Sequence, residues 1–196
     1  MSWPGTVLPS AFYHRDPIEV APELLNKLLC GPGGRVGRIV EVEAYRGGDD
    51  PAAHTFRGRT ARNATMFGPP GHMYVYFTYG MHWCANAVCG DEGVGAGVLM
   101  RALEPLEGLA LMRTLRPKAA KDRDLCNGPA RLAQAFGISG LHNGLDLASG
   151  RNAYTITGDG TPPPDAPQVG PRVGISRATD FPWRWCVPGS ACLSRK

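Results

Sequence analysis

The stretch from residue 36 to residue 45 constrains the fold more than any other part of this chain. Its side chains alternate with the period of two that is typical of a half-buried β-strand. One face would carry Ile39, Glu41 and Glu43, and the other Val40, Val42 and Ala44. The turn-forming residues 47–51 follow, so Glu43 and Tyr45 lie where a strand passes into a loop. Loops held by a rigid strand often carry functional residues.

Two further strands are predicted over residues 72–79 and 82–89, joined through Gly80 and Met81 as a hairpin with an aromatic residue at its tip. A third strand over residues 97–103 would complete an antiparallel meander. In the first of these strands, Tyr74, Tyr76 and Thr78 share one face.

Helical spacing of apolar residues predicts helices over 20–30, 105–116 and 129–136. Residues 46–72 are expected to form a long surface loop, residues 158–167 a flexible excursion, and residues 169–193 short strands that return to the sheet. The sequence therefore predicts one mixed α/β (α+β) domain over residues 1–196. It would have a curved, mostly antiparallel sheet, a protruding β-hairpin and peripheral helices.

The composition fits an ordinary globular protein, since 196 residues with 43% hydrophobic side chains can form one substantial core. No apolar stretch approaches the ~18 residues that a membrane span needs. The first five residues also lack the features of a signal peptide. We expect a soluble, cytoplasmic, monomeric protein with no membrane partner.

The six cysteines include no C-x-x-C pair, so reduced thiols are expected rather than disulfides. His82, Cys84 and Cys89 do not have the spacing of a zinc site, and the H-x-E and P-C-x-x-C motifs of zinc deaminases are missing. Phosphate-loop and dinucleotide-binding fingerprints are missing too. We therefore expect neither a metal nor a cofactor.

The net charge of +4 is too small to indicate nucleic-acid binding by itself. Its distribution is more informative, because basic residues gather in two clusters. They are Arg57, Arg59 and Arg62 in one, and Arg113, Arg116, Lys118, Lys121 and Arg123 in the other. Such clusters suit a phosphate backbone, although a solvated helix end would have the same composition.

Glu43 is the strongest candidate for a catalytic group, because a carboxylate on the apolar side of a strand is costly unless it is paired or functional. An ion pair with an arginine such as Arg101 explains it equally well. Glu41 shares its face, and periodicity does not decide between the two. Tyr79 beside the hairpin turn could be an exposed wedge that opens a base stack, or a core residue.

Six separated motifs, in order along the chain, resemble the alkyladenine (3-methyladenine) DNA glycosylase family. They are IVEVEAY at 39–45, AAH at 52–54, RNxxMF at 62–67, PGxxYVYxxYGM at 70–81, VLxRALEP at 98–105 and LCxGP at 125–129. The resemblance covers most of the chain. At His82 and Ala85 the chain departs from the family pattern, which leaves pocket size and lesion range open.

The resemblance implies a role for each matching residue. Glu43 would be the general base that deprotonates the attacking water, with Arg101 helping to hold that water. Tyr45, His54 and Tyr76 would contact the flipped base, and Asn86 would obstruct the amino group of guanine. Tyr79 would be inserted into the DNA, with Met81 beside it. Arg59 and Gly174 would contact the DNA backbone, and the segment 169–177 would supply backbone groups to the water and to a phosphate.

The resemblance thus implies a monofunctional enzyme that hydrolyses the N-glycosidic bond of alkylated or deaminated purines in double-stranded DNA, in base excision repair. The four lysines lie outside the pocket motifs, which disfavours a Schiff-base mechanism and favours water as the nucleophile. Two other hypotheses stay open at this point. One is a damage-binding protein without catalysis, and the other is a basic globular protein whose tyrosines belong to the core.

Overall fold

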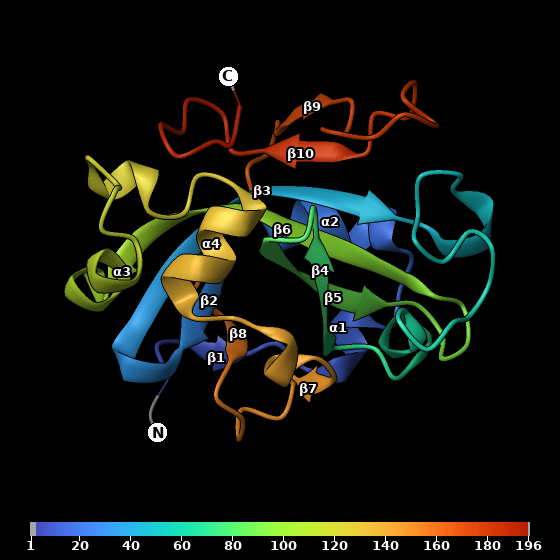
Figure 1. Ribbon diagram of the computed structural model, residues 1–196, viewed down its shortest axis with the longest axis horizontal. Coiled ribbons are helices and arrows are strands. Elements are labelled where there is room, and N and C mark those ends of the chain that lie inside the picture. Colours follow the sequence, from blue (N-terminus) through green and yellow to red (C-terminus); the bar gives the residue numbers. More distant parts are fainter. Residues whose placement is uncertain (1–2, 196) are drawn as a thin grey trace.

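The computed structural model describes residues 3–195 (Figure 1). Within them a ten-stranded sheet curls around the core, and every strand pairing is antiparallel. Its main path runs β1 (Thr6–Val7), β8 (Thr155–Gly158), β2 (Leu28–Gly31), β3 (Arg35–Tyr45), β6 (Ala96–Glu107), β5 (His82–Cys89), β4 (His72–Thr78) and β7 (Leu145–Asp146). In addition, β10 (Arg184–Cys186) pairs with β3, and β9 (Gln168–Gly170) pairs with β10. The predicted fold class is confirmed, as is the return of the tail to the sheet.

The central strand β3 divides the sheet in two. Its first residues pair with β2, and its last pair with β10, where Arg184 lies opposite Glu43. Bulges interrupt its pairing with β6 between Ile39 and Val42. A bulge adds a residue and shifts the alternation. Ile39 consequently packs in the same core cluster as Val42, and the prediction that it shares a face with Glu41 and Glu43 is wrong.

Short helices flank the sheet. They are α1 (Ser10–Tyr13), α2 (Pro17–Leu24), α3 (Leu109–Leu115) and α4 (Pro129–Phe136), together with 3₁₀ turns at Pro32–Gly34, Gly47–Asp49, Ala64–Phe67, Asp122–Asp124 and Gly140–His142. Helix α2 packs against β3 and β6, and α4 packs against β5 and β6. Helix α4 has the predicted bounds, because Pro129 starts it and Gly137 ends it in the left-handed conformation.

Two predicted helices are wrong in extent. Residues 20–30 divide into α2, which ends at Leu24, and β2. All residues of β2 are buried, and the strand pairs with β3 along one edge and with β8 along the other. Asn26, with a φ of 65°, separates the two elements. The helix expected over 105–116 begins only at Leu109, because β6 continues to Glu107 in pairing with β3.

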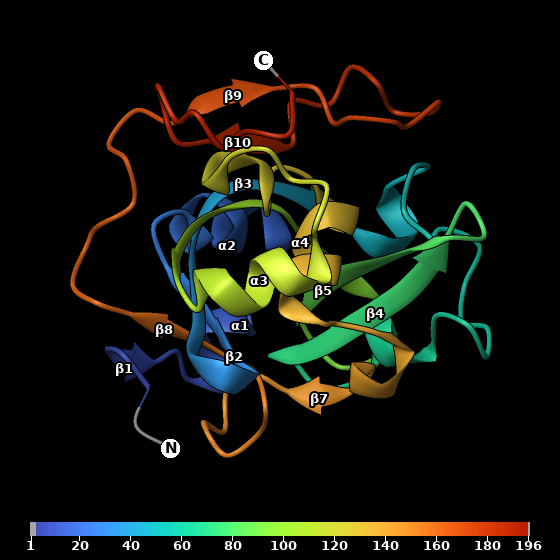
Figure 2. The same ribbon diagram turned by 60° about the vertical axis from the view of Figure 1, so that its left-hand side comes forward.

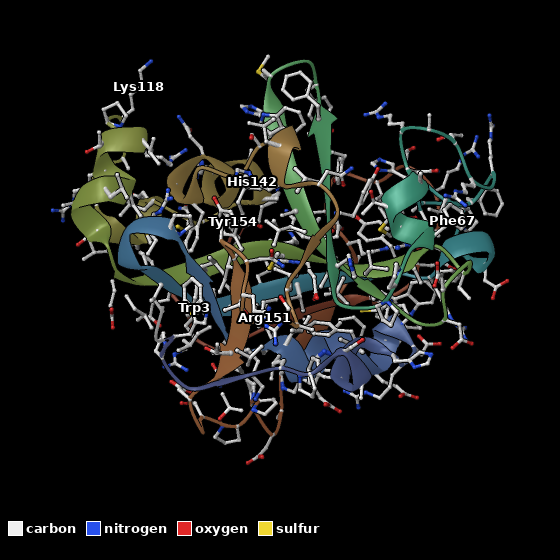
Figure 3. All side chains as sticks on the ribbon, turned by 90° about the horizontal axis from the view of Figure 1, so that it is seen from below. Trp3, Phe67, Lys118, His142, Arg151 and Tyr154 are labelled. Atoms are coloured by element: carbon white, nitrogen blue, oxygen red, sulfur yellow. The ribbon has the colours of Figure 1, made fainter. Side chains whose placement is uncertain are left out.

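The predicted hairpin is confirmed and stands out from the body of the domain (Figure 2). Strands β4 and β5 meet at a turn in which Tyr79 and Gly80 have positive φ angles of 51° and 64°. The left-handed conformation is uncommon for a tyrosine. Figure 3 shows the tip on the same side of the molecule as Lys118, which follows α3.

The buried residues form one large cluster and three smaller ones. All six cysteines are free thiols inside the protein. Between residues 3 and 195, no helix has the length and apolar character needed to cross a membrane.

Candidate active site

Arg101 lies between the two carboxylates of β3. Its Nε is 3.0 Å from Glu41 Oε1, and its Nη1 is 3.2 Å from Glu43 Oε2. Both carboxylate side chains are completely buried, and the arginine side chain is 7% exposed. The ion pair that was the alternative explanation for Glu43 is therefore present, but it is shared with Glu41.

The two carboxylates differ in their other hydrogen-bond partners. Glu41 accepts hydrogen bonds from Arg184 Nε at 2.7 Å and from the amide and hydroxyl of Ser194 at 2.6 and 2.8 Å. Burial would raise the pKa of Glu41, but the Ser194 amide, Arg101 and the other donors together hold it below its ordinary value. Glu41 is therefore a fixed anion that anchors the tail of the chain.

Glu43 has fewer stabilising partners. Its Oε1 accepts the Val173 amide at 2.6 Å, and its Oε2 accepts the Tyr45 hydroxyl at 2.9 Å. Burial raises the pKa of Glu43, and Arg101 and the Val173 amide offset this only in part. A carboxylate with a raised pKa is better suited to accept a proton near neutral pH than Glu41 is.

A cavity of about 570 Å³ lies next to the residues that surround this carboxylate. Its volume falls within the range of small-molecule sites. The lining residues come from six parts of the chain: Tyr45, Pro51, Ala52, His54 and Met66; Tyr74, Tyr76, Thr78, Tyr79, Cys84 and Asn86 on the hairpin; Leu99 and Arg101; residues 127–131; residues 173–177; and Ser194 with Arg195. Glu43 does not line the cavity itself, but its partners Tyr45, Arg101 and Val173 do.

Aromatic rings form the walls of the cavity. The His54 and Tyr76 rings meet edge to face with centroids 4.5 Å apart, and Tyr76 stacks on Tyr74 at 5.5 Å. Tyr45 contributes a further ring. Partial burial of the His54 ring and the nearby Arg62 lower the pKa of His54, so this wall carries no charge of its own at neutral pH.

Asn86 lies on the floor of the cavity and is 3% exposed. Its amide donates to the Tyr74 carbonyl at 3.3 Å, which fixes the side chain. The structure thus brings the four residues predicted for the pocket into one cavity, namely Tyr45, His54, Tyr76 and Asn86.

The hairpin tip extends the cavity outward. Tyr79 is 80% exposed and Met81 is 67% exposed, so neither is a core residue. Tyr79 lines the cavity mouth. This contradicts the hypothesis that the tyrosine beside the turn belongs to the core.

The two residues predicted to contact the DNA backbone differ in position. Gly174 lines the cavity, whereas Arg59 is exposed on the loop of residues 55–62 and does not. Arg131, Arg177 and Arg195, which the sequence did not single out, lie along the cavity rim.

The second basic cluster is partly paired. Arg113 forms an ion pair with Asp122, and Arg116 donates to Gln134 Oε1 at 3.1 Å. Lys118 and Lys121 are exposed. Within this cluster, Arg113 and Arg116 are therefore held by partners inside the protein, whereas Lys118 and Lys121 extend from its surface.

Four residues that form buried or half-buried contacts were also not predicted from the sequence. Asp50 and Arg172 form a fully buried ion pair behind Tyr45, and Arg184 and Ser194 hold Glu41. The partners are separated by 122 to 153 residues, so no local pattern reveals them. In the described part of the chain, no group of three or more His, Cys, Asp or Glu side chains could hold a metal ion.

Comparison with known proteins adds to this geometry. The methylpurine-DNA glycosylase (MPG) family model matches residues 11–191. A protein of Burkholderia cenocepacia is 62% identical over 192 residues, which cover 98% of this chain and 93% of that protein. Proteins of Rhodopseudomonas palustris (48% identical; 97% of this chain, 92% of that one) and Streptomyces avermitilis (46%; 96% and 91%) are also similar. All three are provisionally named 3-methyladenine DNA glycosylase. The chain belongs to the methylpurine-DNA glycosylase family.

As a member of this family, the protein is an N-glycosyl hydrolase that acts on DNA in DNA repair. The resemblance inferred from six motifs is confirmed over most of the chain. The hypotheses of a damage-binding protein without catalysis and of a basic globular protein are accordingly superseded.

Proposed function

We propose that this methylpurine-DNA glycosylase family member removes alkylated or deaminated purines from duplex DNA through a water that Glu43 deprotonates. The observation that carries the proposal is a buried carboxylate of raised pKa directly behind an aromatic cavity. Water would attack C1′ of the damaged nucleotide, the N-glycosidic bond would break, and an abasic site would remain. The protein would act as a monomer.

The attacking water would lie between Glu43, Arg101 and the backbone near Val173. The Val173 amide donates to Glu43 Oε1, and the Tyr45 hydroxyl and Arg101 both lie against Oε2. A carboxylate has about four acceptor positions, so Oε1 can accept one further hydrogen bond from a water. Arg101 would hold the same water and keep Glu43 deprotonated in the resting enzyme.

The aromatic walls suit an alkylated purine. Alkylation at a ring nitrogen makes the purine cationic, and the faces of Tyr45 and Tyr76 attract a cation. A cationic purine is also a ready leaving group, so a positioned water is the main requirement. His54, uncharged at neutral pH, adds a ring without repelling the cation.

Asn86 would restrict the substrate range. Its amide is held by the Tyr74 carbonyl, so it does not swing aside freely. A purine with an amino group that points at this amide would be obstructed. We infer discrimination against undamaged guanine on this basis.

The hairpin tip would take the place of the extruded nucleotide. Extrusion costs a few kcal/mol, and less at a damaged or mispaired site. Tyr79 would intercalate from the minor groove with Met81 beside it, and Arg59 and Gly174 would contact the DNA backbone. The exposed arginines on the cavity rim would add phosphate contacts.

Replacing Tyr79 with alanine should leave the fold intact and weaken binding of a lesion-containing duplex by roughly tenfold, because the wedge contributes about 1–3 kcal/mol of stacking. Tyr79→Phe keeps the ring and should bind within about twofold of the wild type. Fluorescence anisotropy and a thermal melt measure both properties. A large loss of thermal stability in Tyr79→Ala would contradict the wedge role.

The proposed function is tested with end-labelled duplexes that carry one hypoxanthine, one ethenoadenine or undamaged adenine, followed by alkaline cleavage of abasic sites. Alkylated genomic DNA, analysed for released methylpurines, extends the test to cationic bases. We expect product from at least one lesion and none from undamaged adenine. Absence of product from every lesion would overturn the proposal.

A further inference from the structure

A buried ion pair behind Tyr45 takes no direct part in the proposed hydrolysis. Arg172 and Asp50 are both completely buried in their side chains, and Arg172 Nη2 donates to Asp50 Oδ1 at 2.8 Å. Arg172 Nη1 donates to the second oxygen and also to the Ala44 carbonyl at 2.9 Å. A buried ion pair contributes little net stability, because the desolvation of both charges offsets their attraction.

The guanidinium of Arg172 is stacked between two aromatic rings. Its Cζ lies 4.7 Å from the centroid of Tyr45 and 5.0 Å from that of Trp183. One face of the Tyr45 ring is therefore covered by a cation. Only the opposite face is available to a ligand in the cavity.

Asp50 extends the same arrangement to the next wall of the cavity. Its Oδ1 accepts the Ala52 amide at 3.0 Å, and its Oδ2 accepts the Arg46 amide at 3.3 Å. These bonds fix the loop between Tyr45 and His54. Arg172 also directly precedes Val173, whose amide donates to Glu43. The pair thus joins both aromatic walls to the catalytic carboxylate.

The two charges of this pair have opposite sign and offset each other next to the Tyr45 ring. A base stacked on the open face would be separated from the guanidinium by a single ring. An uncompensated guanidinium there would repel a cationic base, whereas a neutral base would be little affected. Asp50 neutralises the guanidinium, and the pair holds the ring without adding net charge.

We propose that Asp50 and Arg172 form a positioning pair that sets the relative preference for cationic and neutral purines through the Tyr45 ring. The inference rests on the proposed function, in which Tyr45 stacks on the extruded base. The compensation of charge within this pair, together with the shape of the cavity, then determines the substrate range.

The test compares Asp50→Asn, Arg172→Gln and the double variant with the wild type at pH 7. The substrates are alkylated duplex DNA, from which release of 3-methyladenine, a cationic lesion without a 2-amino group, is measured, and a duplex with one hypoxanthine, which is neutral. Single-turnover excision rates and affinities are measured for both lesions. The quantity compared between variants is the excision rate for the cationic lesion divided by that for the neutral lesion. Asp159→Asn, which breaks the Arg38–Asp159 pair away from the cavity, is the matched control.

The single variants should move this ratio in opposite directions. Asp50→Asn leaves the Arg172 cation without its counter-charge, which repels a cationic base, and should lower the ratio about tenfold. Arg172→Gln leaves the Asp50 anion without its counter-charge, which attracts a cationic base, and should raise the ratio about tenfold. The double variant is neutral and should return to within about twofold of the wild-type ratio. Asp159→Asn should not change it.

A pair that only supports the fold would reduce both excision rates equally and leave the ratio constant, which would overturn the inference. Thermal melts identify a variant that fails to fold. If Asp50→Asn does so, an unchanged ratio in Arg172→Gln still overturns the inference. A wild type that excises neither lesion refutes the proposed function and this inference with it. If it excises only one of them, the ratio of affinities replaces the ratio of rates.

Discussion

Replacing Glu43 with glutamine should slow excision by about 10²- to 10⁴-fold, the usual contribution of a general base, while the protein still binds a lesion-containing duplex. Glutamine has the same shape and can accept the Val173 amide, but it cannot take a proton from water. Arg101 keeps its partner Glu41, so no buried cation is left unpaired. Single-turnover excision and an equilibrium binding assay measure the two effects.

Glu41→Gln is the matched control, since the two carboxylates are two residues apart and share Arg101. It removes the anionic partner of Arg184 and one of the two anionic partners of Arg101, and it should destabilise the fold by about 3–5 kcal/mol. The excision rate of the folded fraction should stay within about tenfold of the wild type. Unchanged product formation by Glu43→Gln would refute the role of Glu43.

The hairpin and helix α4 could be predicted because local chemistry determines them. Alternating residues and the Tyr79–Gly80 turn define the hairpin, and Pro129 and Gly137 define the ends of α4. These signals lie within a few residues of the elements that they mark. The same holds for the exposure of Tyr79, which follows from its place at a turn.

The helix predicted over residues 20–30 failed because its second half is determined by distant partners. Leu28 and Leu29 have helical spacing, but they pair with Arg38 and Gly37 on one side and with β8 on the other. Apolar residues buried on both faces of a strand cannot be distinguished from a buried helix by periodicity. The β8 strand itself is only four residues long and gave no signal.

The two carboxylates of β3 show, within the site, the same limit of prediction from sequence periodicity. Periodicity placed Glu41 and Glu43 on one face, and the choice between them depended on Val173, Arg184 and Ser194. These partners lie 130 to 153 residues away in the sequence. Only the folded chain shows that Glu41 is fully held and that Glu43 has a raised pKa.

Replacing Arg101 with leucine should lower both the stability of the fold and the rate of excision. It leaves two buried carboxylates, of which Glu43 loses its only cationic partner in the described structure. Breaking a buried pair costs about 3–5 kcal/mol, and the loss of the group that holds the water should slow excision by at least about 10²-fold. Chemical denaturation and single-turnover kinetics measure the two losses.

The pH profile distinguishes a catalytic effect from a loss of stability. Arg101 lowers the pKa of Glu43 against the effect of burial, and the base is active only when deprotonated. Without the arginine the pKa rises further, so the acid limb of the rate profile should move to higher pH. Arg184→Leu is the control. The Arg184 side chain forms its ion pair with Glu41 and not with Glu43, so its loss should reduce stability and leave the limb in place. A limb that moves equally in both variants would mean that Arg101 acts on the fold and not on the base.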